Sequence, residues 1–489
     1  MQPLFTGFVA AAQPINLWYA LLGSLLGTMV GVLPGLGPAS ALAILFPLAG
    51  YLPPTGAIIM LAGIYYGAMY GGSTTAILLN VPGEVASVTT CLDGFQMTRQ
   101  GRAGPALAMA AIVSFVAGTI GTVVLSLSGP ALASVGLNFG PPEYFSLMLF
   151  SLSAIANFSG PSLVRGIAMG LVGMILAAVG FDPLSSAVRL TFGSTQLLLG
   201  FDTVSVLIGL FAISEVLKSG EEGIASIYKG SLGRLLPSAK EFRRGMAAGM
   251  RGTGLGLVLG LVPGLTPSIT AFMAYDVEKR ISKEPEKFGT GVIEGVAAPE
   301  AANNATAVAG FIPLFSLGIP TSPTLAMLLA ALVIYGLKPG PLLFTQYADF
   351  TWTVIASMYI GNVMLLILNL PLVGIWAKLA TVPYKIIAPS ILVFSTVGAY
   401  SMRNSMFDVW TVFAFGIIGF YMNKLEWPTI PLVLGFILGP MVEQALRQSL
   451  SIESSWMIFV NRPLSAAFLA LTVALGLMNV LWRKFRQSP

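Results

Sequence analysis

The 489-residue sequence predicts an all-α polytopic membrane protein. Hydrophobic residues make up 55% of the chain and charged residues only 9%, whereas a soluble globular protein carries about 25% charged residues. The 25 basic and 20 acidic side chains are too few to cover the surface of a soluble chain of this length. Because apolar segments recur along the whole chain and helices satisfy their own backbone hydrogen bonds in lipid, spanning helices are expected throughout.

The composition excludes several classes of function. The chain has no His and one cysteine, Cys91, which rules out Ser-His-Asp and Cys-His catalysis, His-ligated metals and multi-cysteine clusters. It contains no G-x-x-x-x-G-K-[ST] motif for ATP. The net charge of +5 fits basic residues in cytoplasmic loops rather than nucleic-acid binding. We therefore expect no enzyme, and no cofactor or metal other than a coupling ion.

Charge predicts how the chain crosses the membrane. Basic residues gather in the polar stretch 218–251 and again at Arg483, Lys484 and Arg486, and such clusters mark cytoplasmic segments. The first 83 residues carry no charge and lack the basic region of a signal peptide. The N-terminus is thus expected outside the cytoplasm and the C-terminus inside it. Candidate crossings lie at about 105–128, 144–160, 165–180, 203–217, 350–377, 386–402, 406–423, 429–442 and 463–482.

A repeated motif links the two hydrophobic halves. GVLPGLGPASA (31–41) and GLVPGLTPSIT (260–270) both fit G-[VL]-[LV]-P-G-L-x-P. A polar segment follows each copy, YGGSTTAILLNVPGE at 70–84 and EAANNATAVAGFIPLFSLGIPTSP at 300–323. Paired interruptions in both halves point to the binding site of a secondary transporter built on inverted repeats.

The interruptions predict the domain organisation. Each P-G-L-x-P element lies between apolar stretches of about a dozen residues, which are too short to span and are interpreted as re-entrant hairpins. The first half, 1–217, is predicted to hold a hairpin at about 17–50, a broken helix at about 54–83 and scaffold helices at about 105–217. A cytoplasmic linker, 218–250, leads to the second half, 251–489, with its hairpin at about 251–276, broken helix at about 289–335 and scaffold helices at about 347–482.

Helices that break in mid-membrane provide the chemistry of the predicted site. Their orphan N–H groups attract anions, and their free carbonyls and neighbouring hydroxyls replace the hydration shell of a small cation. The candidate substrate-binding residues are Pro34, Gly35, Gly37, Ser73, Thr74, Asn80, Pro82, Gly83, Pro263, Gly264, Thr266, Asn303, Asn304, Pro320, Thr321 and Ser322. The candidate cation-coupling residues are Gly35, Ser73, Asn80, Gly264, Glu300, Asn304 and Thr306. Small and hydroxyl residues also suit plain helix packing, which is the alternative for any single position.

These motifs resemble the large membrane subunit of the bacterial tripartite tricarboxylate transporters. The resemblance rests on GVLPGLGPASALAILFP (31–47), YGGSTTAILLNVPGE (70–84), GLVPGLTPSITAFMAYDVEKR (260–280) and PEAANNATAVAGFIPLFSLGIPTSPTLAMLLAAL (299–332), and it extends over essentially the full length. It implies the translocating subunit of an inner-membrane symport system. The implied partners are a small membrane subunit of about four helices and a periplasmic solute-binding protein. The family is also similar to elevator-type carriers, in which hairpins and broken helices form the moving domain.

Several functions remain open at this point. The leading one is cation-coupled import of a carboxylate, which the resemblance implies to be citrate or a related compound, and the oxygen-rich first site favours Na⁺. The alternative is a proton-coupled carrier of a dicarboxylate or aromatic carboxylate with the same architecture, in which Glu300 or Glu294 carries the proton. A proton-coupled carrier without a binding protein, an intramembrane enzyme built on an Asp or Ser-Lys pair, and a passive channel rank lower, since two broken sites favour alternating transport.

Overall fold

The computed structural model describes residues 2–33, 36–158, 162–182, 185, 187–222, 233–379, 382 and 384–487. These residues are helical almost throughout, and the only strands among them are a two-residue antiparallel pair. Within the described ranges, 7 helices are long and apolar enough to cross a membrane. The prediction of an all-α polytopic membrane protein is therefore confirmed.

The first half of the chain runs from α1 to α10. Its elements are α1 (Gln2–Ala11), α2 (Pro14–Val32), α3 (Pro38–Ala49), α4 (Pro54–Leu79), η1 (Val85–Ser87), α5 (Val88–Arg99), α6 (Ala103–Gly136), α7 (Pro141–Phe158), α8 (Leu163–Ala177), β1 (Gly180–Phe181), β2 (Val188–Arg189), η2 (Thr195–Leu197), α9 (Thr203–Leu207), the π-helical turn η3 (Ile208–Ile213) and α10 (Ser214–Glu222).

The second half runs from α11 to α23. Its elements are α11 (Ala239–Leu259), α12 (Pro267–Ile281), η4 (Pro285–Lys287), α13 (Glu294–Ala309), α14 (Phe311–Leu317), α15 (Pro323–Ile334), α16 (Leu342–Thr345), α17 (Ala348–Asn369), α18 (Val373–Leu379), α19 (Tyr384–Arg403), α20 (Met406–Lys424), α21 (Thr429–Ile452), α22 (Ile458–Asn461) and α23 (Pro463–Gln487).

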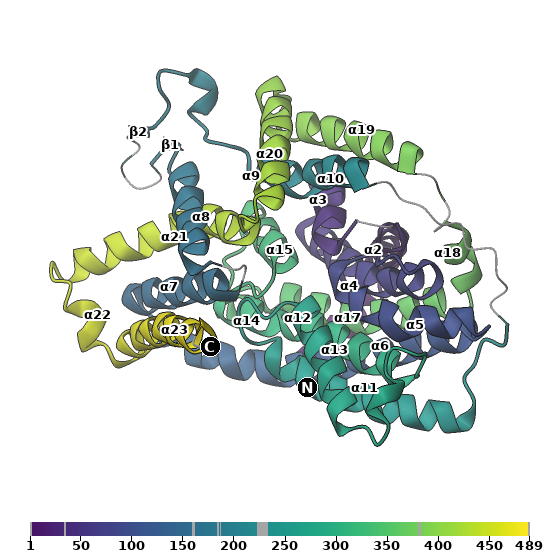
Figure 1. Ribbon diagram of the computed structural model, residues 1–489. Coiled ribbons are helices and arrows are strands. Elements are labelled where there is room, and N and C mark those ends of the chain that lie inside the picture. The colour runs from purple at the N-terminus through teal and green to yellow at the C-terminus, as the bar shows by residue number, and fades with distance from the viewer. Residues whose placement is uncertain are drawn as a thin grey trace.

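Two groups of helices stand apart from each other. Figure 1 shows α7, α8, α21, α22 and α23 together on one side, and α2, α4, α5, α11 and α13 on the other. The long helices α6 and α17, which the sequence assigned to the scaffold, pack against the second group: α6 on α13, and α17 on α2 and α4. The helices α3, α12, α14 and α15 also contact members of this group. We call the second group, with α3, α6, α12, α14, α15 and α17 included, the broken-helix bundle.

Glycines allow the helices of the broken-helix bundle to approach closely. A Cβ built on Gly27 of α2 would lie 2.5 Å from the carbonyl oxygen of Ile64 in α4, and one built on Gly256 of α11 would lie 2.4 Å from that of Ala302 in α13. Small residues drive such contacts between membrane helices because they bring the two backbones together. The pairs α2–α4 and α11–α13 thus pack in the same way in the two halves.

The two broken helices also end alike. The helix α4 ends at left-handed Asn80 (φ 58°), and α14 ends at left-handed Gly318 (φ 75°). Left-handed residues are common helix terminators. A proline follows two positions later in each case, Pro82 and Pro320, and it cannot continue the preceding helix because it lacks an N–H.

The first arms of the predicted hairpins are longer than expected. The helix α2 has 19 residues and is itself long enough to cross a membrane. The helix α11 has 21 residues and begins inside the predicted linker, because Ser238 and Glu241 form a capping box that starts a helix at Ala239. The first broken helix also resumes beyond its predicted end, as α5.

Candidate functional site

Three half-helices begin at one cavity. The helix α3 starts at Pro38 after the N-cap Gly37, α12 starts at Pro267 after Thr266, and α15 starts at Pro323 after Ser322. Proline suits the first helical position because its φ is already helical and no N–H is needed there. All three starts line a cavity of about 640 Å³, here called the central pocket.

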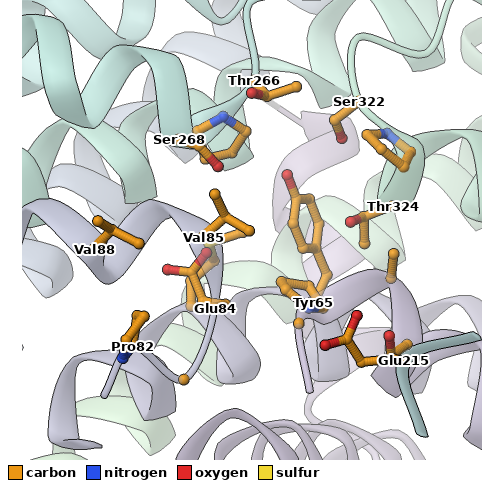
Figure 2. A pocket seen from close by; sticks show the side chains of 18 of the residues that line it. Tyr65, Pro82, Glu84, Val85, Val88, Glu215, Thr266, Ser268, Ser322 and Thr324 are labelled. Carbon is orange, nitrogen blue, oxygen red and sulfur yellow. The ribbon is translucent and has the colours of Figure 1, made fainter. Parts of the chain in front are cut away.

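Apart from Ile430, the remaining wall of the central pocket comes from the first half of the chain. The break after α4 contributes Pro82, Gly83 and Glu84, and α4 itself contributes Tyr65, whose hydroxyl points toward Ser322 (Figure 2). Its full lining is Gly37, Pro38, Ala39, Ser40, Tyr65, Met69, Val81, Pro82, Gly83, Glu84, Val85, Val88, Glu215, Lys218, Ser219, Thr266, Pro267, Ser268, Ser322, Pro323, Thr324 and Ile430.

The electrostatics of the central pocket suit an anion with several carboxylates. Each helix N-terminus carries roughly half a positive charge on its unpaired N–H groups, and three of them face this cavity. The hydroxyls of Ser268 and Thr324 in the same wall are further hydrogen-bond donors (Figure 2). A site of this kind binds carboxylates without a dedicated arginine clamp.

A second polar cluster lies deeper in the bundle and centres on Glu300. This side chain is fully buried. Ser73 Oγ donates to Oε2 of Glu300 at 2.6 Å and Asn303 Nδ2 donates to the same oxygen at 3.4 Å, while Thr90 Oγ1 donates to Oε1. These bonds tie α4 and α5 to α13. Asn304 Nδ2 extends the cluster by donating to Ser114 Oγ on α6 at 2.8 Å.

A small cavity of about 10 Å³ adjoins this cluster. Polar side chains in its wall are Tyr70, Ser73, Thr74, Ser114 and Asn369. Asn369 is buried, and its Oδ1 has no hydrogen-bond partner among the described residues. A cavity of this size admits one particle of about the size of a water molecule. An unpaired acceptor among hydroxyls fits a small dehydrated cation, because hard cations prefer oxygen ligands.

The structure brings most of the predicted site residues into these two places. Gly37, Pro82, Gly83, Thr266 and Ser322 line the central pocket. Ser73, Thr74, Asn303, Asn304 and Glu300 belong to the deeper cluster or its cavity.

Other predicted residues have different surroundings. Thr306 donates to Thr270 Oγ1 at 2.8 Å, and the N–H of Gly264 donates to the carbonyl of Thr321 at 3.1 Å, which holds the second break against the P-G-L-x-P turn. Pro263 and Pro320 flank that contact along the chain. Asn80 is exposed and lies outside the pocket lining. Pro34 and Gly35 lie outside the described residues.

Sequence reasoning missed several lining residues, notably Tyr65, Glu84, Ser268 and Thr324, and Asn369 in the small cavity. For Glu84 a signal was present, since it is the first charged residue of the chain and directly follows a helix break. Ser268 lies inside the second copy of the repeated motif, and Thr324 follows Ser322 by two residues, so both were within reach of the same signal. Tyr65 and Asn369 lie in apolar segments and carry no comparable signal.

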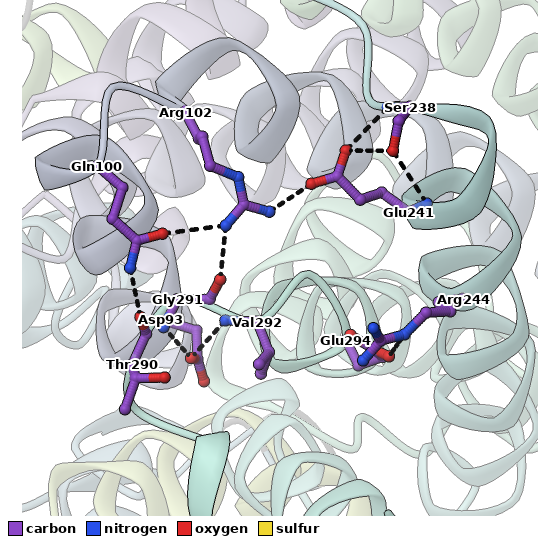
Figure 3. Close-up of polar contacts among 10 residues, drawn as sticks. All are labelled: Asp93, Gln100, Arg102, Ser238, Glu241, Arg244, Thr290, Gly291, Val292 and Glu294. Atoms are coloured by element: carbon purple, nitrogen blue, oxygen red, sulfur yellow. Dashed lines mark hydrogen bonds and ion pairs between the residues drawn. The ribbon is translucent and has the colours of Figure 1, made fainter. Parts of the chain in front are cut away.

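A polar network braces the bundle near the start of α11 (Figure 3). Buried Asp93 on α5 accepts the N–H groups of Gly291 at 2.8 Å and Val292 at 2.9 Å. Arg102 pairs with Glu241, and the hydrogen bonds from Ser238 and Arg102 outweigh the effect of burial and hold the pKa of Glu241 below its usual range. Glu294, a candidate proton carrier, is paired with Arg244 in this network.

Two broken helices around a pocket that suits an anion, in an all-helical membrane protein, are typical of a secondary transporter. Residues 17–434 match the Tripartite tricarboxylate transporter TctA family. The chain belongs to this family and is a large membrane subunit of a tripartite tricarboxylate transporter. As a transporter family it is not enzymatic, and it implies further subunits and a periplasmic binding protein.

Two relatives from Agrobacterium vitis are similar to this chain. The "Uncharacterized 52.8 kDa protein in TAR-I ttuC' 3'region" is 44% identical over 480 residues, covering 98% of this chain and 96% of that protein. The "Uncharacterized protein in TAR-II ttuC' 3'region" is 43% identical over 212 residues, covering 43% of this chain and 88% of that protein. No solved structure matches the chain.

Proposed function

We propose that this subunit imports citrate or a related carboxylate across the bacterial inner membrane by cation-coupled alternating access, with the central pocket as the substrate site. The observation that supports the proposal most is the convergence of three half-helix N-termini on one cavity. A periplasmic solute-binding protein delivers the substrate, and a small four-helix membrane subunit completes the complex. The N-terminus faces the periplasm and the C-terminus the cytoplasm, as the basic residues at Arg483, Lys484 and Arg486 indicate.

The transport motion in this proposal is of the elevator type. The matching contacts α2–α4 and α11–α13, and the matching helix ends at Asn80 and Gly318, support two inverted repeats. The broken-helix bundle carries the central pocket and moves as one body. The group of α7, α8, α21 and α23 stays fixed and meets the small subunit (Figure 1). Alternating access by movement of one helix group against another is common to carriers built on repeats.

Na⁺ is the coupling ion that we favour. The small cavity offers hydroxyl oxygens and the unpaired Oδ1 of Asn369. Glu300, which accepts a hydrogen bond from Ser73 of the cavity wall, adds a negative charge beside it. The alternative is a proton carried by Glu300 in a dicarboxylate or aromatic-carboxylate carrier of the same architecture. Glu294 is less suited to that role because it is already paired with Arg244.

Uptake of labelled citrate into proteoliposomes tests this function. The vesicles contain this chain and its small subunit, with the purified binding protein outside, and carry either an inward Na⁺ gradient or a pH gradient without Na⁺. We expect accumulation with the Na⁺ gradient and only in the presence of the binding protein. Accumulation with the pH gradient alone would support the proton alternative. No accumulation of citrate, dicarboxylates or aromatic carboxylates under either gradient would contradict the proposal.

A further inference from the structure

Glu84 places a carboxylate inside the pocket that is proposed to bind an anion. The side chain lines the central pocket and is only 5% exposed. Its Oε2 accepts the N–H of Ala86 at 2.6 Å. Its Oε1 is buried and has no hydrogen-bond partner among the described residues. One of the two carboxylate oxygens at the proposed substrate site therefore has no hydrogen-bond donor to offset its burial.

The surrounding chain holds this carboxylate in place. Glu84 and Ser87 form a capping box at the start of η1. The Glu84 side chain lies against Gly72 of α4, where an added Cβ would be 2.7 Å from Glu84 Cγ, and it also faces Gly37. The capping box and the close packing against Gly72 hold Glu84 at the wall of the central pocket.

The charged and titratable groups around Glu84 do not neutralise it. Within the lining, Tyr65 is uncharged, Glu215 is a second carboxylate, and Lys218 is exposed on α10. Behind Glu84, Glu300 on α13 adds a further carboxylate, whose hydrogen bonds come from Ser73, Thr90 and Asn303. Cys91 on α5 is buried close by and is not an ion pair partner. The neighbouring carboxylates thus make the electrostatic potential at Glu84 negative, which adds to the cost of burying its charge.

This arrangement sets up a conflict that only a cation resolves. The three helix N-termini attract a di- or tricarboxylate, while the Glu84 carboxylate in the same cavity repels it. Repulsion between like charges is strong where water is scarce. We propose that Glu84 makes substrate binding conditional on one monovalent cation, a proton or Na⁺, that neutralises its carboxylate as the substrate enters. This inference rests on the proposed function, because it requires the substrate to occupy the central pocket.

Glu84 would in this way couple transport of the anion to transport of the cation. A carrier in which the anion and the cation bind together cannot pass the anion alone, so accumulation follows the cation gradient. Neutral Gln at this position mimics the cation-loaded carboxylate. The Glu84→Gln carrier should accordingly bind and exchange substrate without the cation, but lose the ability to concentrate it.

Citrate binding to the purified complex of this chain with its small subunit tests the inference. Affinity is measured at a series of Na⁺ concentrations at fixed pH, and at a series of pH values without Na⁺, for the wild type and Glu84→Gln. We expect the wild-type affinity to fall at least about tenfold when the coupling cation is withdrawn. The variant should lose most of this response, and the Na⁺ dependence that remains should be that of the separate small cavity beside Glu300. The series in which the wild type responds identifies the cation as Na⁺ or H⁺.

Controls separate the inference from the proposed function. Glu143 is a buried carboxylate that pairs with Arg462 and does not line the central pocket; Glu143→Gln should keep the wild-type cation dependence. Glu84→Ala, also neutral and smaller, carries the same prediction if Glu84→Gln does not fold. A folded neutral variant that retains the wild-type cation dependence, or that no longer binds citrate at all, overturns the inference. A wild type that transports no carboxylate overturns the proposed function instead.

Discussion

Gly83→Ala is expected to reduce uptake strongly while leaving the protein in the membrane. A Cβ at this position would lie 2.1 Å from the carbonyl oxygen of Gly31 and 2.6 Å from Cα of Gly72. Both contacts are backbone, so the break that carries Glu84 must move away from α2 and α4. Because this break forms one wall of the central pocket, we expect citrate uptake in proteoliposomes to fall by about tenfold or more, in line with the cost of small displacements at a preorganised site.

The matched control for Gly83→Ala is Gly254→Ala. Gly254 lies within α11, where an added Cβ meets nothing within 4 Å. Since alanine has the higher helix propensity, this variant should transport normally and be slightly more stable, by about 1 kcal/mol or less. Equal uptake by the two variants, at equal amounts of protein in the vesicles, would show that the first break does not shape the substrate site.

Glu300→Ala is expected to remove uptake and to destabilise the fold. The change deletes the acceptor for Ser73, Thr90 and Asn303 and leaves these buried donors unsatisfied. Each unsatisfied buried group costs about 1–3 kcal/mol, so the unfolding temperature in detergent should drop clearly. Uptake per folded molecule should fall to background, because the hydrogen bonds that join α4 and α5 to α13 through Glu300 are lost.

Glu300→Gln separates packing from charge. Glutamine keeps the shape and one acceptor oxygen, so most of the lost thermal stability should return. If Glu300 contributes its charge to the bound cation, uptake by this variant should need a higher Na⁺ concentration than the wild type. Full wild-type uptake and Na⁺ dependence in Glu300→Gln would contradict a role for this carboxylate in coupling.

The parts of the site that depend on short sequence motifs could be predicted from the sequence. Pro82 and Pro320 each lie in a short polar segment between apolar stretches, which predicts a helix break. The structure ends a helix just before each of them. The repeated P-G-L-x-P turns likewise predicted breaks, and new helices start at the last proline of each motif, Pro38 and Pro267. These features depend only on neighbouring residues and are therefore readable from one chain.

Features that depend on distant contacts were not predictable. Asn369 becomes part of a polar cavity only because α17 packs against α4 and α6, and nothing near it in sequence indicates this. Asn80 has a residue type that suits the site, but its left-handed conformation ends α4 and it is exposed outside the pocket lining. The helix α2 is longer than predicted because it begins already at Pro14, where proline suits the first turn of a helix.

Protection of a single cysteine in the central pocket tests most directly whether this cavity is the carboxylate site. Cys91 is buried and is first replaced by serine. Ser268→Cys then places a thiol in the pocket lining, and Thr290→Cys places one at an exposed position outside the lining. Labelling of the purified complex with a charged maleimide is followed with and without saturating citrate. We expect citrate, together with the coupling cation, to slow labelling of Ser268→Cys at least several-fold and to leave Thr290→Cys unchanged. Unchanged labelling of Ser268→Cys, with a substrate that the complex demonstrably transports, would contradict the account.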